Sequence, residues 1–274
     1  MVSMMKVGYL GPAGTFTHQA ASLFFPRGVE LLPFDNVGQI FEALHDGEID
    51  FGVAAIDNTV EGPVLPTIDG LLNHPEVVAV GGTWLPIQFD AYALAGTEKF
   101  EVGTGHPHAL AQVSRALKQF AVEPLAAASN GAGLANLTLG QIAFGPPGYA
   151  QLGVVTVAEN VGDYPDAKTQ FVLLSPRSTC GWDQSGASIG AQWATMLAIT
   201  PGATGPGVLA RITAEFASHD LNLSALFSRP IKGVVGRYVF IVTVDAPPTS
   251  AAIRQVITEL TAAGDEVRLL GAWQ

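Results

Sequence analysis

Short apolar segments alternate with amphipathic segments along the first two-thirds of the chain, and this alternation constrains the fold more than any other feature. The apolar segments are rich in β-branched and aliphatic residues, as buried strands are. Between two of them, Val37, Ile40, Phe41 and Leu44 lie at helical spacing. Strand and helix in alternation predict an α/β domain with a mainly parallel sheet. The first expected strands cover residues 6–10, 29–32, 51–56 and 77–80.

The pattern starts again near residue 86, which predicts a second α/β unit. Two such units in succession favour two lobes with a cleft between them, where small ligands usually bind. The expected elements are strands at 87–94, 123–127, 141–144, 153–157 and 169–174, and helices at 107–120 and 130–139.

The C-terminal part has a different element order. Residues 175–190 show no sustained periodicity and contain Pro, Gly and Ser, so a linker is expected there. Beyond it, six segments follow the order βαββαβ, which is the ferredoxin-like arrangement of a separate small domain. The expected strands are 193–199, 221–227, 238–244 and 266–270, with helices at 207–218 and 250–262.

Composition excludes several classes of function. The formal charge of −11 disfavours nucleic acid and anionic membranes as partners. Cys180 is the only cysteine, so neither an intramolecular disulfide nor a cysteine-based metal site is expected. The N-terminus does not resemble a signal peptide, and no apolar run reaches the roughly 18 residues of a spanning helix. These features predict a cytoplasmic protein.

Two polar segments follow expected strands of the first unit. Residues 11–16, Gly-Pro-Ala-Gly-Thr-Phe, form a glycine-rich turn that opens a helix, which suits either an anion site or a plain tight turn. Residues 57–63 place Asp, Asn, Thr and Glu at the end of another strand, where α/β proteins place ligand groups. The alternative is a capping box in which Asn58 caps a helix and Glu61 lies three residues on.

Two further polar segments lie in the second of the two α/β units expected from the sequence, which begins near residue 86. Residues 103–112 contain His106 and His108, but histidines two apart do not share a helix face, so no metal pair is expected. Residues 168–171, Lys-Thr-Gln-Phe, enter the last strand of that unit. Residues 131–133, Gly-Ala-Gly, lack the third glycine of a dinucleotide fingerprint. The residues alone predict a small-anion site between the lobes.

In this order, the four segments resemble the motifs of the prephenate dehydratase family. Gly11–Phe16 is similar to Gly-Pro-x-Gly-Thr-Phe, and 57–62 to Glu-Asn-Ser-x-x-Gly. Residues 105–112 resemble Ser-His-Pro-Gln-Ala-Leu-Ala-Gln, and 169–171 resemble Thr-Arg-Phe. In the tail, 207–210 and 227–230 are similar to the Gly-Ala-Leu-Val and Glu-Ser-Arg-Pro motifs of an ACT domain.

The resemblance implies a periplasmic-binding-protein-like catalytic domain at 1–178, with lobes at about 5–84 plus 160–176 and 85–159. A linker at 179–190 and an ACT domain at 191–274 follow. The reaction would convert prephenate to phenylpyruvate by loss of carbon dioxide and hydroxide, without cofactor or metal. Thr169 would protonate the leaving hydroxyl, with Asn58 and Gln112 as positioning groups. The resemblance adds as substrate-binding residues Thr15, Phe16, Thr59, Glu61, Gly62, Gly105, His106, Lys168, Gln170 and Phe171.

The ACT resemblance implies that L-phenylalanine is the effector and that the chain forms a homodimer or homotetramer. The implied allosteric residues are Gly207, Val208, Leu209, Ala210, Ser228, Arg229 and Pro230.

The chain departs from the family motifs at four positions. Gln170 stands in place of Arg, Asp57 in place of Glu, Gly105 in place of Ser and Phe227 in place of Glu. Because residues 168 and 170 share a strand face, Lys168 is a candidate for the missing positive charge. Two other functions stay open: a prephenate decarboxylase that keeps the ring hydroxyl, and a sensor of aromatic amino acids without activity.

Overall fold

The computed structural model describes residues 4–127, 129–149, 151–179, 192–231, 233–234 and 236–274. The chain divides into two compact units, Met1–Ile68 with Thr83–Phe171, and Asp69–Gly82 with Val172–Gln274. Helix α3 (Leu65–Asn73) and the strands β5 (Val77–Pro86) and β11 (Lys168–Pro176) contribute residues to both. Cys180 and most of the expected linker at 179–190 lie outside the described residues, and the expected domain boundaries stay predictions.

The first unit begins with parallel strands in the order β2-β1-β3, where β1 is Met5–Leu10, β2 is Val29–Phe34 and β3 is Phe51–Asn58. Helices α1 (Phe16–Phe24) and α2 (Val37–His45) connect them, as the alternating pattern predicts. The short strand β4 (Gly62–Pro63) pairs with β3. The segments that follow β1 and β3 therefore leave from the carboxyl ends of neighbouring parallel strands.

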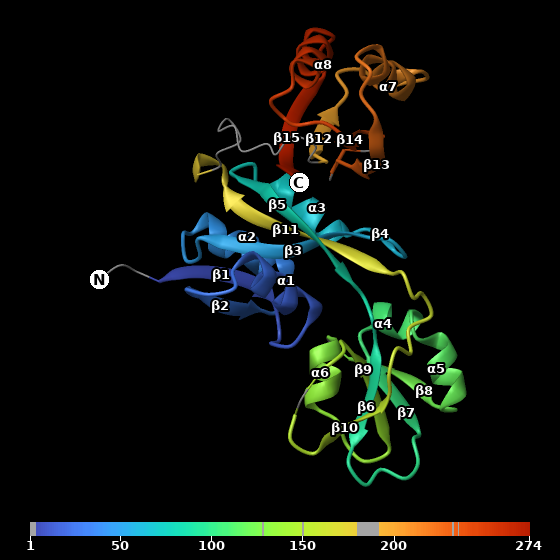
Figure 1. Cartoon of the computed structure of the whole chain (residues 1–274). Coiled ribbons are helices and arrows are strands. Elements are labelled where there is room, and N and C mark those ends of the chain that lie inside the picture. The colour runs from blue at the N-terminus through green and yellow to red at the C-terminus, as the bar shows by residue number, and fades with distance from the viewer. Residues whose placement is uncertain (1–3, 128, 150, 180–191, 232, 235) are drawn as a thin grey trace. The chain divides into compact units, whose positions relative to one another are not determined.

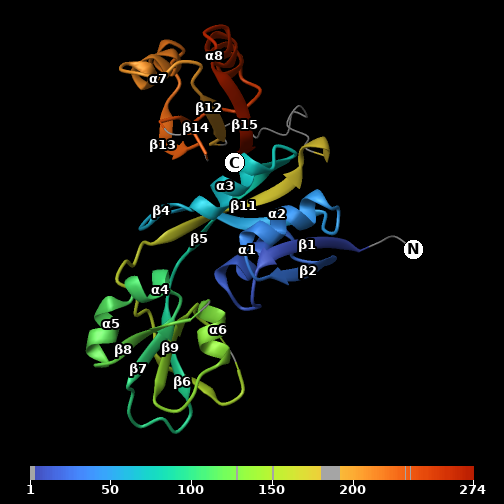
Figure 2. The same cartoon turned by 180° about the vertical axis from the view of Figure 1, so that it is seen from behind.

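The first unit also contains a five-stranded sheet in the order β10-β6-β9-β7-β8 (Figure 1). Helices α4 and α5 pack on one face of this sheet, in the apolar cluster that contains Phe144. Helix α6 packs on the other face, in the cluster that contains Ala143. Figure 2 shows α5 and α6 flanking this sheet from opposite sides. The elements are β6 (Asp90–Leu94), β7 (Val102–Gly105), β8 (Glu123–Ala126), β9 (Gln141–Gly145), β10 (Val154–Ala158), α4 (Pro107–Ala111), α5 (Ser114–Gln119) and α6 (Asn130–Ala135).

Three sequence predictions in this region are wrong in their extent. The expected helix at 107–120 is two helices, because Gln112 and Val113 leave helical geometry between α4 and α5. The backbone oxygen of Gln112 accepts a hydrogen bond from the N–H of Asp163 at 2.7 Å, and this tertiary contact lies at the break. The expected helix at 130–139 ends at Ala135, and the expected strand at 87–94 begins only at Asp90.

The second unit contains the predicted βαββαβ module. Its strands β12 (Ala194–Thr200), β13 (Leu223–Pro230), β14 (Tyr238–Val244) and β15 (Glu266–Trp273) are antiparallel in the order β13-β14-β12-β15. Helices α7 (Val208–Ser218) and α8 (Ala251–Ala262) pack on one face of this sheet, around Phe216 and Val256. Beyond β15 the sheet continues with β5 and the end of β11, and Gly271 of β15 pairs with Ala79 of β5. The ferredoxin-like arrangement is confirmed.

No helix among the described residues is long and apolar enough to span a membrane.

Candidate active site and regulatory module

The side chains of Asn58 and Thr169 meet although they lie far apart in the sequence. The amide Nδ2 of Asn58 donates a hydrogen bond to Oγ1 of Thr169 at 2.7 Å. The other end of the amide is fixed as well, because Oδ1 accepts from the backbone N–H groups of Val60 and Glu61 at 2.8 and 2.9 Å. Thr169 is buried. Its oxygen accepts from Asn58, so the hydroxyl keeps its own proton for another acceptor.

This geometry corrects the capping-box alternative for Asn58. Asn58 does accept from the N–H three residues on, but no helix starts there. The chain instead forms β4, and α3 begins only at Leu65. Glu61 is exposed, and Gly62 has a φ of 78°, a conformation that favours glycine. Asn58 is thus held by a local turn that orients it toward β11.

Backbone contacts fix the segment after β3 to the start of β11. The N–H of Thr59 donates to the oxygen of Lys168 at 2.9 Å, and the N–H of Lys168 donates to Oγ1 of Thr59 at 2.9 Å. Along β11, Lys168 is exposed and Gln170 is half-buried, whereas Thr169 and Phe171 are buried. The side chains of Lys168 and Gln170 therefore lie on one face of the strand, and Thr169 lies on the other.

Asp57, which precedes Asn58 on β3, is half-buried. Burial raises the pKa of Asp57, and a hydrogen bond from the backbone of Asn58 opposes that rise.

The glycine-rich turn after β1 opens helix α1 as expected. Thr15 is the N-cap, and its Oγ1 accepts from the N–H of His18 at 3.2 Å. Thr15 is buried and Phe16 half-buried. The free N–H groups of a helix start can bind an anion, which is the role expected for this turn.

The start of α6 packs against the same turn. A Cβ placed on Gly131 would lie 2.5 Å from Cγ of Pro12, so only glycine permits this approach. The neighbouring side chain of Asn130 accepts a hydrogen bond from the N–H of His106 at 2.9 Å. Asn130 and Gly131 therefore connect the turn after β1 with the segment that opens α4. The sequence does not predict a role at the site for either residue, and Gly131 stands out there only as part of an incomplete dinucleotide fingerprint.

The segment at α4 contributes a buried polar side chain. Gln112 is 6% exposed, and its Oε1 has no hydrogen-bond partner among the described residues. A buried acceptor without a partner is costly unless a ligand satisfies it. His106 caps α4, with Nδ1 accepting from the N–H of His108 at 3.3 Å. Burial, together with the nearby His108, lowers the pKa of His106, so its imidazole is neutral at pH 7.

One apolar cluster contacts all four predicted segments. Phe16 and Val60 pack on a core that contains Leu110 and Ala167. Phe16 also meets the ring of Phe89 edge to face, with ring centroids 5.5 Å apart. The cluster thus joins the turn after β1, the turn after β3, helix α4 and the residue that precedes β11. Gly105 is buried beside Leu110, and a Cβ placed on this glycine would lie 3.5 Å from that side chain.

The predicted allosteric residues lie in two segments of the second unit. Gly207 has a φ of 86° and precedes α7 without a side-chain cap, and Val208, Leu209 and Ala210 form the first turn of that helix. Ser228 and Pro230 are exposed on β13. Arg229 forms a bidentate ion pair with Asp69 of α3, with Nε and Nη2 at 2.9 and 2.6 Å from the carboxylate oxygens.

The fold and these sites define a two-part protein in which an α/β catalytic region precedes a small ligand-sensing module. The prephenate dehydratase family model matches residues 7–179, and the ACT domain model matches residues 203–260. This chain belongs to the prephenate dehydratase family, whose members are hydro-lyases, and it carries a C-terminal ACT domain.

Individual relatives support this membership. The prephenate dehydratase of Bacillus subtilis is 32% identical, over 98% of this chain and 99% of the relative. A solved structure titled as prephenate dehydratase in complex with L-Phe, from Arthrobacter aurescens, is 28% identical, with a TM-score of 0.83 over 98% of this chain and 90% of that one. The enzyme structure from Staphylococcus aureus has 28% identity and a TM-score of 0.78, over 98% and 100% of the two chains.

Proposed function

We propose that this chain converts prephenate to phenylpyruvate in the cytoplasm, as a step of L-phenylalanine biosynthesis. The hydrogen bond from Asn58 to Thr169 is the observation that carries the proposal. In the reaction, the bond between the ring and its carboxylate breaks and the electron pair enters the ring. The bond from the ring to the hydroxyl breaks with its own pair, and carbon dioxide leaves. The departing hydroxide, hydrogen-bonded by Thr169, becomes water with a proton that comes from the solvent.

Thr169 is the group that donates to the departing hydroxyl. Its oxygen is occupied by Asn58, so its proton is directed to the substrate. The pKa of a hydroxyl is far above 7, so Thr169 acts through a hydrogen bond that strengthens in the transition state. The buried Oε1 of Gln112 accepts a hydrogen bond from the same substrate hydroxyl and so aligns it. Neither role needs a cofactor.

The two carboxylates of prephenate need separate positive partners because the chain as a whole is acidic. The start of α1 at Thr15 and Phe16 receives one of them through backbone N–H groups. Lys168 starts from the strand face opposite Thr169, at the exposed beginning of β11, so its long side chain has to reach around the strand to receive the other carboxylate and replace the charge that Gln170 lacks. Thr59, Gly62, Gly105, His106 and Phe171 shape the site around these contacts, and Glu61 lies at its exposed edge.

The test is to incubate the full chain with prephenate at neutral pH and to identify the products by mass and ultraviolet spectrum. Phenylpyruvate above the level without enzyme is the expected result. Thr169→Val should lower kcat by roughly 100- to 1,000-fold, which is the cost of a lost transition-state donor. Thr156→Val, at an exposed strand position of the same unit, is the matched control and should keep full activity. A product that has lost only carbon dioxide would assign a decarboxylase, and unchanged prephenate would assign a sensor.

L-Phenylalanine is the proposed effector of the ACT domain, at the start of α7 near Gly207 and at the end of β13. The positive φ of Gly207 leaves the first turn of α7 open to a ligand carboxylate. We propose a homodimer or homotetramer in which the ACT domains associate, because β13 is an edge strand with Leu226 exposed. Light scattering after size exclusion should give a multiple of the chain mass, and a monomer with and without L-phenylalanine would contradict it.

A further inference from the structure

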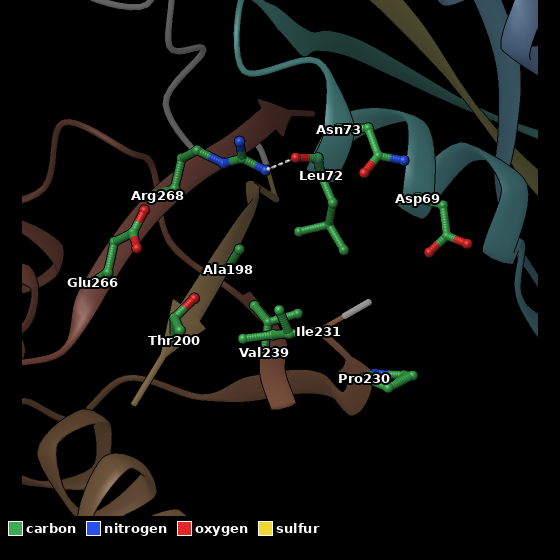
Figure 3. Close-up of a pocket in the computed structure, with 10 residues that line it drawn as sticks. All are labelled: Asp69, Leu72, Asn73, Ala198, Thr200, Pro230, Ile231, Val239, Glu266 and Arg268. Carbon is green, nitrogen blue, oxygen red and sulfur yellow. Dashed lines mark hydrogen bonds between the residues drawn. The ribbon is translucent and has the colours of Figure 1, made fainter. Parts of the chain in front are cut away.

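Two polar side chains outside the sequence motifs differ in how the rest of the chain uses their hydrogen-bonding groups. Arg268 lines a pocket of the second unit, and its Nη2 donates to the carbonyl oxygens of Leu71 and Leu72 at 3.0 and 2.8 Å. Figure 3 shows the second of these bonds. Asn130 of α6, in the first unit, has only its acceptor bound. Oδ1 accepts from the N–H of His106 at 2.9 Å, whereas Nδ2 has no acceptor within the described part of the chain.

The partner of Asn130 determines how its amide is oriented. A backbone N–H can only donate, so the atom that faces His106 is the carbonyl oxygen, and the NH2 group points elsewhere. Asn58 is held in the same way, with two backbone N–H groups at Oδ1 and with Nδ2 directed to Thr169. Asn130 is half-buried, so its NH2 group is a donor in a fixed position.

Asn130 lies where two of the motif segments meet. The next residue, Gly131, packs on the turn after β1, and a Cβ placed on it would lie 2.5 Å from Cγ of Pro12 and 3.3 Å from Cγ2 of Thr15. A Cβ placed on Gly105 would lie 3.5 Å from Oδ1 of Asn130. The amide is therefore close both to the N-cap of α1, where a substrate carboxylate is proposed to bind, and to the buried Gly105.

The amide also borders the space that a side chain at position 105 would enter. The nearest atoms to a Cβ at that position belong to Asn130 and Leu110, and of these two side chains only Asn130 is polar. Gly105 has no hydroxyl of its own, although a serine is typical of the motif at this position. Asn130 is thus placed to supply a polar contact that the glycine lacks.

We propose that Asn130 is a substrate-binding residue whose Nδ2 donates a hydrogen bond to the carboxylate at the start of α1. The inference rests on the proposed dehydratase function. A carboxylate has about four lone-pair sites, so it accepts from a side-chain amide and from the backbone N–H groups of a helix start at the same time. A hydrogen bond to an ionised acceptor is about twice as strong as a neutral one. This donor attracts an anion without a further cation, in a chain whose formal charge is −11.

Asn130→Asp separates the donor from the contact with His106. Aspartate keeps an oxygen for the N–H of His106, but it has no N–H to donate and adds a negative charge beside the substrate carboxylate. The KM for prephenate should rise by about tenfold or more, with little change in kcat, because a ground-state contact is lost. Asn136→Asp, the same change at the exposed C-terminal end of α6, is the matched control and should leave KM unchanged. An unaltered KM in Asn130→Asp would overturn the proposal, since it would limit Asn130 to holding His106.

A second substitution tests the relation between positions 105 and 130. Gly105→Ser in the Asn130→Ala background should lower the raised KM part of the way, because a Cβ at position 105 meets only ordinary contacts and the hydroxyl enters the space that the amide leaves. A KM that the serine does not lower would contradict this relation. Circular dichroism confirms that each variant folds.

The same variants separate this inference from the proposed activity. If the wild type binds prephenate without converting it, the dehydratase function is wrong, and calorimetric dissociation constants for prephenate take the place of KM. Asn130→Asp should then weaken binding by about tenfold or more, and equal affinity in the wild type and Asn130→Asp would overturn the role of Asn130.

Discussion

At the residue scale, the orientation of one amide determines what the candidate catalytic hydroxyl can do. Asn58 is held at Oδ1 by two backbone N–H groups, so only its Nδ2 can face Thr169. The direction of the hydrogen bond follows from that constraint. An aspartate at position 58 would only accept, and it would draw the proton of Thr169 away from a substrate.

The proposed contact between Lys168 and a substrate carboxylate can be tested with a single substitution. Lys168→Ala should raise the KM for prephenate by about tenfold with little change in kcat, because it removes a ground-state contact to a carboxylate. Steady-state kinetics of the full chain measure both constants. Lys118→Ala, at an exposed position of α5, is the control and should leave KM unchanged. An unaltered KM in Lys168→Ala would show that Lys168 does not supply the positive charge that is missing at Gln170.

The sequence predicted Asn58, Gln112 and Thr169 through their motifs, but it could not predict what holds them. Asn58 contacts Thr169 from 111 residues away, and the backbone oxygen of Gln112 accepts a hydrogen bond from the N–H of Asp163. Such contacts depend on the tertiary fold, and no local spacing reveals them. The mistaken capping box at Asn58 has the same cause, because spacing alone does not separate a turn from a helix start.

At the scale of elements, the break between α4 and α5 is a tertiary effect. The apolar spacing at 107–120 suits one helix, yet the carboxylate of Asp163 accepts from the N–H groups of Ser114 and Arg115 at 2.7 and 3.1 Å and so starts a second one. This remote cap leaves Gln112 at the end of α4, outside regular helix geometry. Regular strands such as β1 and β3 were predictable, because burial there follows local apolar runs.

Asp163 should make the stability of the first unit depend on pH. Burial alone would raise the pKa of Asp163, but its hydrogen bonds from Ser114 and Arg115 outweigh burial and lower it. A lowered pKa means that the stabilisation is present above the ordinary carboxyl value of 3.8 and is lost as the pH falls through the folded-state value. Asp163→Ala should therefore reduce the free energy of unfolding at pH 7 by about 2 kcal/mol.

Urea unfolding at a series of pH values measures this difference. The gap in the free energy of unfolding between the wild type and Asp163→Ala should shrink as the solution becomes more acidic. Asp166→Ala removes an exposed carboxylate close by and should change stability little at any pH. A gap that stays constant with pH would show that the carboxylate of Asp163 contributes no charge-dependent stability.

At the scale of the whole molecule, the order of the helices and strands was predictable from the sequence. The contact of α3 with the ACT domain was not. The βαββαβ pattern follows from local periodicity and is observed in full. The contact between Arg229 and Asp69 spans 160 residues and follows no sequence signal. It places part of α3 in the same compact unit as the ACT domain.

A double-mutant cycle tests what this ion pair contributes. Asp69→Asn and Arg229→Gln should each lower the free energy of unfolding of the second unit by about 1–2 kcal/mol, since both groups are mostly buried and doubly bonded. The double variant should lose less than the sum of the two, and urea unfolding gives the coupling energy. Asp220→Asn, an exposed carboxylate in the same unit, is the control. Strictly additive losses would mean that the pair makes no net contribution.

The packing of α6 on the turn after β1 has a consequence for how this chain can vary. Gly131 belongs to none of the four motifs, yet a single methyl group there would overlap Pro12 by more than an ångström of ordinary contact distance. In a library that samples every substitution at every position, Gly131 should therefore tolerate as little exchange as Thr169, although for a steric reason and not a chemical one. A comparison of sequences restricted to the motifs would overlook it.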